Sequence, residues 1–347
     1  MGSALRRLPL VTLYLTERCN SRCVTCDYWR HGRVDLSLDS VRQLLPALHE
    51  LQTQVVLISG GEPLLNPDWA QIAQLLRANG LKLWLLTSGL SLAKHSRRVC
   101  ELFAAVTVSL DGTNAASYAA TRGLDAFDKV CEGISAVANI GAHVSVRVTL
   151  QRANYRELPE FVRLTRRLGA QGVSFLAVDV ANPHAFGRTD DFAADLALGT
   201  SDLPVLEGIL HSMESDFAEE FRSGFIAENP QKLARIQQYF AAVQGTAPYP
   251  PVRCNAPEFS AVIDANRRVH PCFFIPGPAQ RARSGKPPSA DPLREALNSD
   301  PMMRLRAGIR AGERLECPTC VCSMWRDPAA VEARGLLPSS RQVGARR

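Results

Sequence analysis

Short, dense apolar runs alternate with segments of helical periodicity through the first 180 residues. Six runs have the character of buried strands and lie at residues 9–15, 54–59, 82–87, 105–110, 143–150 and 172–180. Four segments between them carry apolar residues every three or four positions: Val41, Leu44, Leu45, Leu48 and Leu51; Trp69, Ile72, Leu75 and Leu76; Phe127, Val130, Cys131, Ile134 and Val137; Leu158, Phe161, Val162 and Leu168. Gly80 follows the second stripe where a helix commonly ends. The alternation predicts repeated βα units and a parallel sheet.

The repeat stops after residue 181. Residues 182–250 are more polar and predict helices near 204–222 and 231–243. From Cys254 a Cys-bearing segment follows, with a predicted hairpin of residues 262–264 and 269–271 in which Asn266 takes the positive φ of the turn. We expect a loop at 276–292. The predicted division is therefore a barrel-sized unit at 1–181, a helical segment at 182–250, a Cys-bearing domain at 251–326 and a loosely held tail at 327–347.

Composition narrows the class of protein. The chain has 347 residues and a formal charge of +6, from 40 basic and 34 acidic residues. No concentrated basic stretch with interleaved aromatic residues is present, so we expect no nucleic-acid partner. No apolar run is long enough to predict a membrane span. Ten Cys without a secretory signal favour a cytoplasmic location, where grouped thiols serve metals or catalysis more often than disulfides.

Three cysteines follow the first predicted strand directly. Cys19, Cys23 and Cys26 have the spacing C-x3-C-x2-C. Three thiolates can hold three irons of a four-iron cluster, which leaves one iron open to a small molecule that chelates through its amine and carboxylate. Zinc ligation or buried thiols are the plainer alternatives. The spacing and its place after the first strand resemble the radical S-adenosylmethionine (radical SAM) superfamily.

The resemblance implies an open (β/α)6 partial barrel, bound SAM and a [4Fe-4S] cluster on Cys19, Cys23 and Cys26, which would be the catalytic cysteines. The stretch after the second strand is similar to the family's GGEP motif, which contacts the amino end of SAM. Together with polar residues after or on the later strands, the resemblance implies a set of cofactor-binding residues. They are Gly60, Gly61, Glu62, Pro63, Ser88, Ser109, Asp111 and Arg147.

Several of these residues have a second interpretation. Asp111 either contacts SAM or braces its own loop. Arg147 could hold the SAM carboxylate, bind substrate or pair with a carboxylate of the barrel. Trp29 and His31 either line the SAM pocket or cover the cluster. These alternatives stay open at the level of sequence.

Further cysteines lie near the C-terminus, at Cys254, Cys272, Cys317, Cys320 and Cys322. Four Cys can fully ligate one [4Fe-4S] cluster, and tetrahedral zinc accepts the same residues. Their order and spacing resemble the Twitch auxiliary domain, the shortened relative of the SPASM domain, as in the aminocyclitol dehydrogenase of butirosin biosynthesis. The resemblance implies one auxiliary cluster on the first four, with Cys322 a substitute ligand or a spare thiol. Cys100 and Cys131 lie on helical segments and are expected to be core thiols.

The function implied is that of a radical SAM oxidoreductase that takes electrons from a flavodoxin or ferredoxin. We expect it to dehydrogenate a small hydroxylated or sugar-like metabolite, with the auxiliary cluster accepting the second electron. Peptide maturation is the alternative. Most peptide-modifying relatives carry an N-terminal leader-binding domain, and the stretch of about eight residues before the first strand is too short for one. A redox-neutral rearrangement, elimination or epimerisation also remains, with Cys322 as a hydrogen donor. An iron-sulfur or zinc scaffold is disfavoured, because the GGEP sequence and the SLDG sequence at residues 109–112, which resembles that of radical SAM enzymes with auxiliary clusters, would have no purpose in it.

Overall fold

A curved parallel sheet organises the chain. The computed structural model describes residues 4–30, 32–184, 186, 194–278 and 292–334. Six consecutive strands pair in parallel in sequence order: β1 (Leu10–Tyr14), β2 (Val55–Ser59), β3 (Lys82–Thr87), β4 (Ala105–Ser109), β5 (Val144–Leu150) and β6 (Gly172–Ala177). Each lies within a few residues of its predicted range. The predicted α/β class with a (β/α)6 partial barrel is confirmed.

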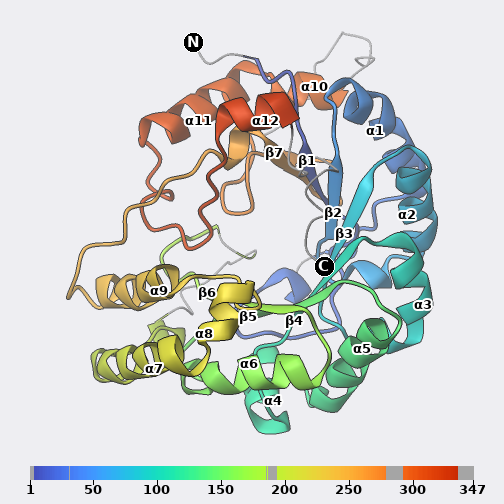
Figure 1. Cartoon of the computed structure of the whole chain (residues 1–347). Coiled ribbons are helices and arrows are strands. Elements are labelled where there is room, and N and C mark those ends of the chain that lie inside the picture. The colour runs from blue at the N-terminus through green and yellow to red at the C-terminus, as the bar shows by residue number, and fades with distance from the viewer. Residues whose placement is uncertain (1–3, 31, 185, 187–193, 279–291, 335–347) are drawn as a thin grey trace.

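Helices follow the strands and cover the convex side of the sheet (Figure 1). They are α1 (Leu38–Glu50), α2 (Trp69–Ala78), α3 (Leu92–Leu102), α4 (Ala115–Arg122), α5 (Phe127–Asn139) and α6 (Leu158–Arg167). The four predicted apolar stripes correspond to α1, α2, α5 and α6. Gly80 has the positive φ of 79° expected just beyond α2. The helix α4 did not stand out in the sequence, because it has few apolar residues.

Alternation along the strands gives the sheet two different faces. In β5, Val144, Val146 and Val148 are fully buried, and they pack beneath the helices. Ser145, Arg147 and Thr149 alternate with them and are less buried, so they point to the concave side. Buried valines and leucines in the other strands continue the core. The concave side is therefore where polar side chains of the strands gather.

The C-terminal segment adds to the same sheet. β7 (Ser260–Ile263) pairs in parallel with β1, with Leu10 opposite Ser260, and β8 (Val269–His270) pairs antiparallel with β7. The strand order is β6-β5-β4-β3-β2-β1-β7-β8. The predicted hairpin is confirmed, but the positive φ of its turn falls on Arg267, at 65°, and not on Asn266. Asn266 instead donates a hydrogen bond of 2.5 Å to Glu17 on the loop after β1.

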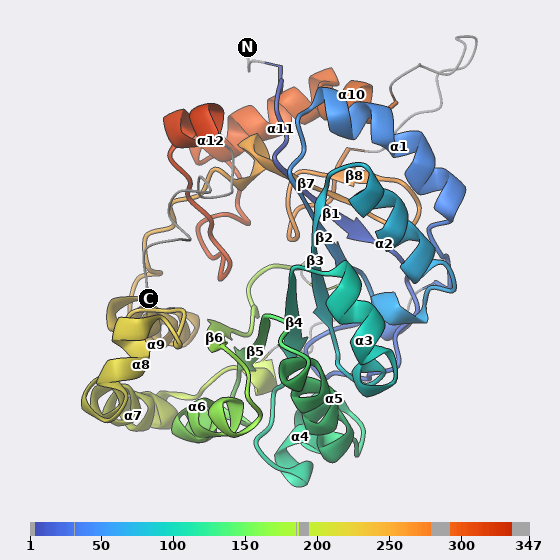
Figure 2. The ribbon, with the colours of Figure 1, turned by 45° about the vertical axis from the view of Figure 1, so that its right-hand side comes forward.

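The remaining helices lie at the open side of the sheet and beyond β7 (Figures 1 and 2). They are α7 (Leu203–Asp216), α8 (Ala218–Ser223), α9 (Pro230–Val243), α10 (Pro292–Leu297), α11 (Asp300–Ala311) and α12 (Pro328–Arg334). The two predicted helical regions within 182–250 are confirmed. Within the tail expected from 327, residues 328–334 form α12. Residues 335–347 lie outside the described residues, as does most of the predicted loop, residues 279–291.

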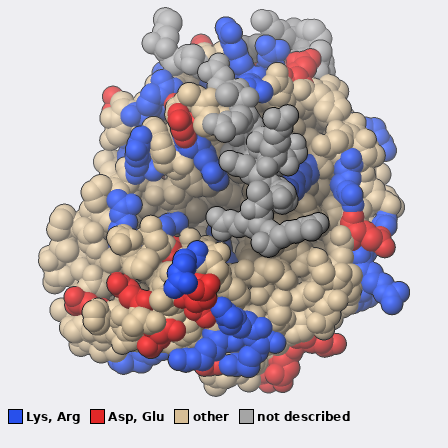
Figure 3. All heavy atoms as spheres, viewed as in Figure 1, with Lys and Arg blue, Asp and Glu red and all other residues tan. Residues whose placement is uncertain are grey.

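The surface carries charge of both signs. On the face in Figure 3, basic and acidic side chains are interspersed over the lower part of the molecule. Within the described ranges, no helix combines the length and the apolar character needed to cross a bilayer.

Candidate functional site

The three N-terminal cysteines lie together on the loop between β1 and α1. Cys19, Cys23 and Cys26 are each partly buried. The backbone N–H of Cys26 donates to the carbonyl of Cys23 at 3.3 Å, which turns the loop back on itself. Burial raises the pKa of Cys19 to about 11 and that of Cys26 to about 12, and the neighbouring charge of Cys23 adds to the effect in both. Thiolates here therefore need a nearby positive charge, such as a metal centre supplies.

Gly60 and Gly61 let the turn after β2 approach this loop closely. A side chain at Gly61 would place its Cβ 2.2 Å from the carbonyl oxygen of Arg18, and Gly60 has a φ of +126°. The backbone N–H groups of Gly61 and Glu62 donate to the carbonyls of Thr16 and Arg18, at 2.9 and 2.8 Å. The two glycines thus fix the turn against the cysteine loop.

Glu62 is fully buried at the end of β2 and is held by groups of its own chain. Its carboxylate accepts hydrogen bonds from the hydroxyls of Thr87 and Ser88 and from the backbone N–H of Ser88 and Leu64. Pro63 directly after it opens a short 3-10 helix, Pro63–Leu65. Ser88 is also 3.3 Å from Asn20 of the cysteine loop. The structure therefore brings together Glu62, Ser88 and the cysteine loop, as the sequence predicted.

Asp111 braces its surroundings. One carboxylate oxygen accepts from the backbone N–H of Thr149 at 2.7 Å, and the other pairs with Arg122 at 3.0 Å. Both oxygens are occupied by the chain, and the residue is 1% exposed. Of the two expected roles, the hydrogen bonds show the bracing one.

Ser109 and Arg147 face each other across neighbouring strands. They are register partners in β4 and β5, and Arg147 is in turn the register partner of Ser174 in β6, whose hydroxyl it contacts at 3.3 Å. Arg147 is exposed although it lies inside the sheet. These three residues form one polar level on the concave side.

The C-terminal cysteines gather on that same side. The segment between α11 and α12 dips toward the concave face (Figures 1 and 2), and it carries Cys317, Cys320 and Cys322. Burial raises the pKa of Cys272 to about 12, and the charges of Cys254 and Cys317 raise it further. Burial also raises the pKa of Cys320, with Cys322, Cys254 and Cys272 adding to the effect. The four predicted ligands are thus electrostatic neighbours.

Cys322 occupies a different position from the other four. Burial raises its pKa, whereas the charge of Arg147 on β5 lowers it. It therefore lies between the cysteine group and the polar level of the barrel. Cys100 and Cys131, on α3 and α5, are both partly buried, and Cys100 packs against the core.

The arrangement suits clusters better than single ions. Within the ranges that the structure describes, no three His, Cys, Asp or Glu side chains converge tightly enough to hold one metal ion. Each Cys ligand of a four-iron cluster binds its own iron, so such a site needs thiols grouped around a volume and not around a point. Beside the triad, the Nε of Arg122 is buried and has no hydrogen-bond partner among the described residues. An anionic cluster would give this donor an acceptor, so the residues fit the group.

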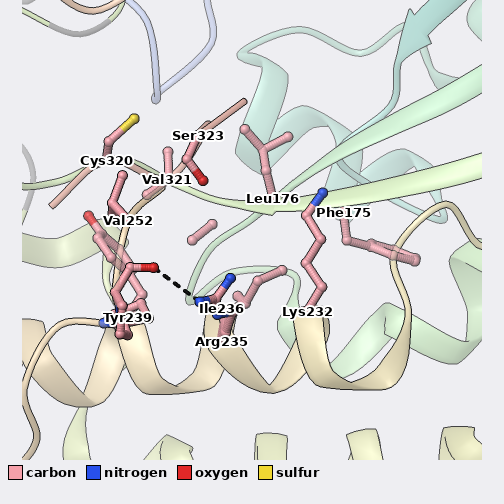
Figure 4. Close-up of a pocket in the computed structure, with 13 residues that line it drawn as sticks. Phe175, Leu176, Lys232, Arg235, Ile236, Tyr239, Val252, Cys320, Val321 and Ser323 are labelled. Carbon is pink, nitrogen blue, oxygen red and sulfur yellow. Dashed lines mark hydrogen bonds between the residues drawn. The ribbon is translucent and has the colours of Figure 1, made fainter. Parts of the chain in front are cut away.

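An open pocket adjoins the C-terminal cysteines (Figure 4). It has a volume of about 70 Å³ and lies between the end of β6, α9 and residues 320–323. Lys232 and Arg235 line it from α9, and Arg235 donates to the carbonyl of Pro251 at 3.0 Å. Cys320 and Ser323 approach from the opposite wall.

Sequence reasoning missed Arg122, which lies beside the triad. Arg122 is the last residue of α4, and Gly123 follows it as the C-cap. The Arg-Gly pair at a helix end was the feature of the sequence that could have pointed to Arg122. Trp29 lies between the guanidinium groups of Arg22 and Arg30, at 5.5 and 4.7 Å from its ring centre. His31 lies outside the described residues.

Comparison with known proteins gives one family match. Residues 13–165 match the sequence model of the family described as "Radical SAM superfamily". This range begins in β1 and includes the three cysteines, Glu62, Ser88, Ser109, Asp111 and Arg147.

Two curated relatives each match about half of the chain. GTP 3',8-cyclase from Klebsiella pneumoniae (strain 342) is 33% identical over 168 residues, 45% of this chain and 51% of the relative. Mycofactocin maturase MftC from Mycobacterium tuberculosis is 29% identical over 191 residues, 54% of this chain and 47% of the relative. The chain thus spans about half the length of these relatives.

Solved structures share the fold over nearly the whole chain. SuiB of Streptococcus suis bound to S-adenosylmethionine has a TM-score of 0.60 at 14% identity, and covers 95% of this chain and 76% of its own. The likeness holds equally for SuiB bound to its precursor peptide SuiA, with a TM-score of 0.60 and 74% of that chain covered. At this identity the likeness shows the fold alone.

Proposed function

Residues 13–165 match the radical SAM superfamily, and on that premise we propose that the chain is a radical SAM enzyme that dehydrogenates a small hydroxylated or sugar-like metabolite. Cys19, Cys23 and Cys26 would hold the [4Fe-4S] cluster, with SAM on its open iron. Bound there, the two cofactors supply, by the chemistry of the superfamily, a 5′-deoxyadenosyl radical that removes hydrogen from a C–H bond. The chain's own residues bind, orient and shield the reactants.

The polar level of the concave side supports a hydroxylated substrate. Ser109, Arg147 and Ser174 offer hydroxyl and guanidinium groups at one height of the sheet, beyond the apolar layer that faces the helices. Hydroxyls both donate and accept, whereas guanidinium only donates. Such a set would orient SAM or a substrate by hydrogen bonds.

The observation that carries the proposal is the gathering of Cys254, Cys272, Cys317 and Cys320. Four protein thiolates saturate an auxiliary [4Fe-4S] cluster and leave no iron for substrate. A cluster held in this way would accept the second electron after a hydrogen atom has been removed from the substrate carbon, and the hydroxyl proton would pass to solvent. Such an acceptor favours net loss of two hydrogen atoms over a rearrangement.

The outer face of the triad loop supports an external one-electron donor of the flavodoxin or ferredoxin type. Val24 and Val34 are 38% and 42% exposed, and Arg22 and Arg30 are exposed beside them. An apolar centre with a basic rim suits an acidic carrier protein. Reversal of both arginine charges should slow reduction by flavodoxin and leave reduction by dithionite unchanged. Equal slowing by both reductants would argue against this face. Such an exchange also suits the reducing cytoplasm, which we propose as the compartment.

Anaerobic reconstitution tests the function. Wild type should bind about eight irons and a variant with Cys19, Cys23 and Cys26 changed to Ala about four. Dithionite-reduced wild type should convert SAM to 5′-deoxyadenosine, and a panel of polyols, aminocyclitols and sugars should reveal a product lighter by two hydrogen atoms. Iron at only four per chain, all lost in the triple variant, would remove the electron-acceptor argument.

Peptide modification is a second candidate, favoured by the open pocket between β6 and α9, which is accessible to a chain as well as to a metabolite. A relative is a maturase, and SuiB has been solved with a precursor peptide. If 5′-deoxyadenosine forms with precursor peptides and not with metabolites, this candidate replaces the first.

A further inference from the structure

A buried ion pair lies directly behind the triad loop. Arg122, the last residue of α4, and Asp111, just after β4, are joined at 3.0 Å with side chains 10% and 1% exposed. Asp111 is tied to β5 through the backbone N–H of Thr149. Most ion pairs in the described chain are more exposed, as Arg98 and Glu101 are on α3, at 40% and 60%. Burial of a charge pair costs desolvation free energy that a surface pair avoids. A buried pair behind the cysteine loop therefore requires an explanation.

The end of α4 is docked on the loop that carries the cysteines. The backbone N–H of Arg22 donates to the carbonyl of Arg122, and that of Val24 to the carbonyl of Thr121, both at 3.1 Å. Arg22 and Val24 flank Cys23. The backbone of residues 121–122 is therefore one hydrogen bond away from the chain on either side of Cys23.

The guanidinium of Arg122 is only partly used by the protein. One Nη binds Asp111, while the buried Nε has no partner among the described residues. A buried N–H without an acceptor costs about 1–3 kcal/mol. The Tyr118 hydroxyl, which is likewise buried without a hydrogen-bond partner in the part of the chain that the structure describes, is a further neighbour of this guanidinium. The carbonyls of Thr121 and Arg122 bind the chain on both sides of Cys23, so the guanidinium belongs to the immediate surroundings of the triad.

We propose that Arg122 is a positioning residue of the radical SAM cluster: its guanidinium donates to the cluster on the Cys23 side and raises the cluster's reduction potential, while Asp111 fixes its orientation. The sign follows from electrostatics, since a nearby positive charge favours the more negative, reduced form. Asp111 carries the opposite charge at nearly the same place and partly offsets this effect. The inference rests on the proposed function only in that the triad holds a cluster; it does not depend on the substrate.

Two single substitutions test it by the direction of the change in potential. Arg122→Gln removes the positive charge, and Asp111→Asn removes the negative one with little change of shape. An EPR-monitored redox titration, with the radical SAM cluster identified by its response to added SAM, measures the potential in the reconstituted enzyme. The exposed pair on α3 supplies the matched control, Arg98→Gln, which should titrate as wild type does.

We expect Arg122→Gln to lower the ratio of reduced to oxidised cluster at least tenfold at a fixed potential, which for one electron is about 59 mV. Asp111→Asn should change the ratio in the opposite direction, and Arg122→Lys should restore most of the wild-type value. Changes of the same sign in the two variants, or wild-type potentials in both, would overturn the proposal and leave a purely structural ion pair. If Arg122→Gln holds too little iron to titrate, the sign for Asp111→Asn decides alone. A wild type without a SAM-responsive cluster would instead defeat the proposed function.

Discussion

Glu62 accepts two hydrogen bonds from Ser88, one from its backbone N–H at 2.7 Å and one from its hydroxyl at 2.6 Å. The pair joins the end of β2 to the end of β3 directly beneath the cysteine loop. The Glu62 carboxylate thus holds the ends of the two strands together, and it is also a candidate for contact with SAM.

Glu62→Gln should destabilise the apo-protein by about 2–4 kcal/mol, because an amide NH2 faces buried donors where an oxygen accepted before. Urea unfolding measures the change. The matched control is Glu101→Gln, at an exposed carboxylate on α3, which should stay within about 0.5 kcal/mol of wild type. Equal stability of the two variants would show that the network around Glu62 contributes little.

Gly123→Ala should disrupt the triad loop. Gly123 has a φ of +73°, and an added Cβ would lie 2.1 Å from the carbonyl oxygen of Arg22. Gly224 has nearly the same φ, +75°, with nothing within 4 Å. Gly224→Ala therefore carries only the left-handed backbone cost of about 1–2 kcal/mol. We expect Gly123→Ala to lose most of its triad iron on reconstitution and Gly224→Ala to lose none; equal iron in both would contradict the close contact.

Cys320→Ala should lose the auxiliary cluster, whereas Cys322→Ala should keep it. Cys320 lies among Cys254, Cys272 and Cys322, while Cys322 also faces Arg147 of the barrel. Iron and sulfide assays should give about four irons for the first variant and about eight for the second. The reverse result would make Cys322 the fourth ligand.

Arg147→Met should weaken SAM binding about tenfold or more through loss of a charge-assisted hydrogen bond. Stability and iron content should change little, because Arg147 is exposed and donates its hydrogen bond to Ser174 on the neighbouring strand. Equilibrium dialysis with SAM measures the affinity. Arg235→Met, in the outer pocket, is the charge-matched control. If the affinity for SAM is unchanged while the KM for substrate rises, Arg147 binds the substrate.

The strands and the triad were predictable because their signals are local. β5 is a run of alternating valines, and Cys19, Cys23 and Cys26 carry their spacing in eight consecutive residues. Asp111 could be recognised as a polar residue at a strand end, but its role depended on Arg122, which lies eleven positions further on. No local pattern shows which carboxylate a helix-ending arginine meets.

Other features could not be predicted because they depend on distant parts of the chain. The hairpin of β7 and β8 was visible in the sequence, but its pairing with β1 was not, since parallel strands can join at any separation. The positive φ of that hairpin falls on Arg267, because residues 264–267 form a turn closed by the N–H of Arg267 on the carbonyl of Asp264, and the residue that ends such a turn takes the left-handed conformation. The residue types alone did not show which position of the turn this would be.

The pairing of β1 with β7 has a consequence for biosynthesis. Leu10 and Ser260 are 250 positions apart (260 − 10 = 250), and at about 5–20 residues per second the ribosome needs roughly 12–50 s to make the chain between them. During that time one side of β1 is an unpaired edge beside the cysteine loop, open to pairing with other nascent chains. A cluster inserted before the chain leaves the ribosome would therefore enter an incomplete sheet. Insertion of iron after β7 has paired with β1 avoids this.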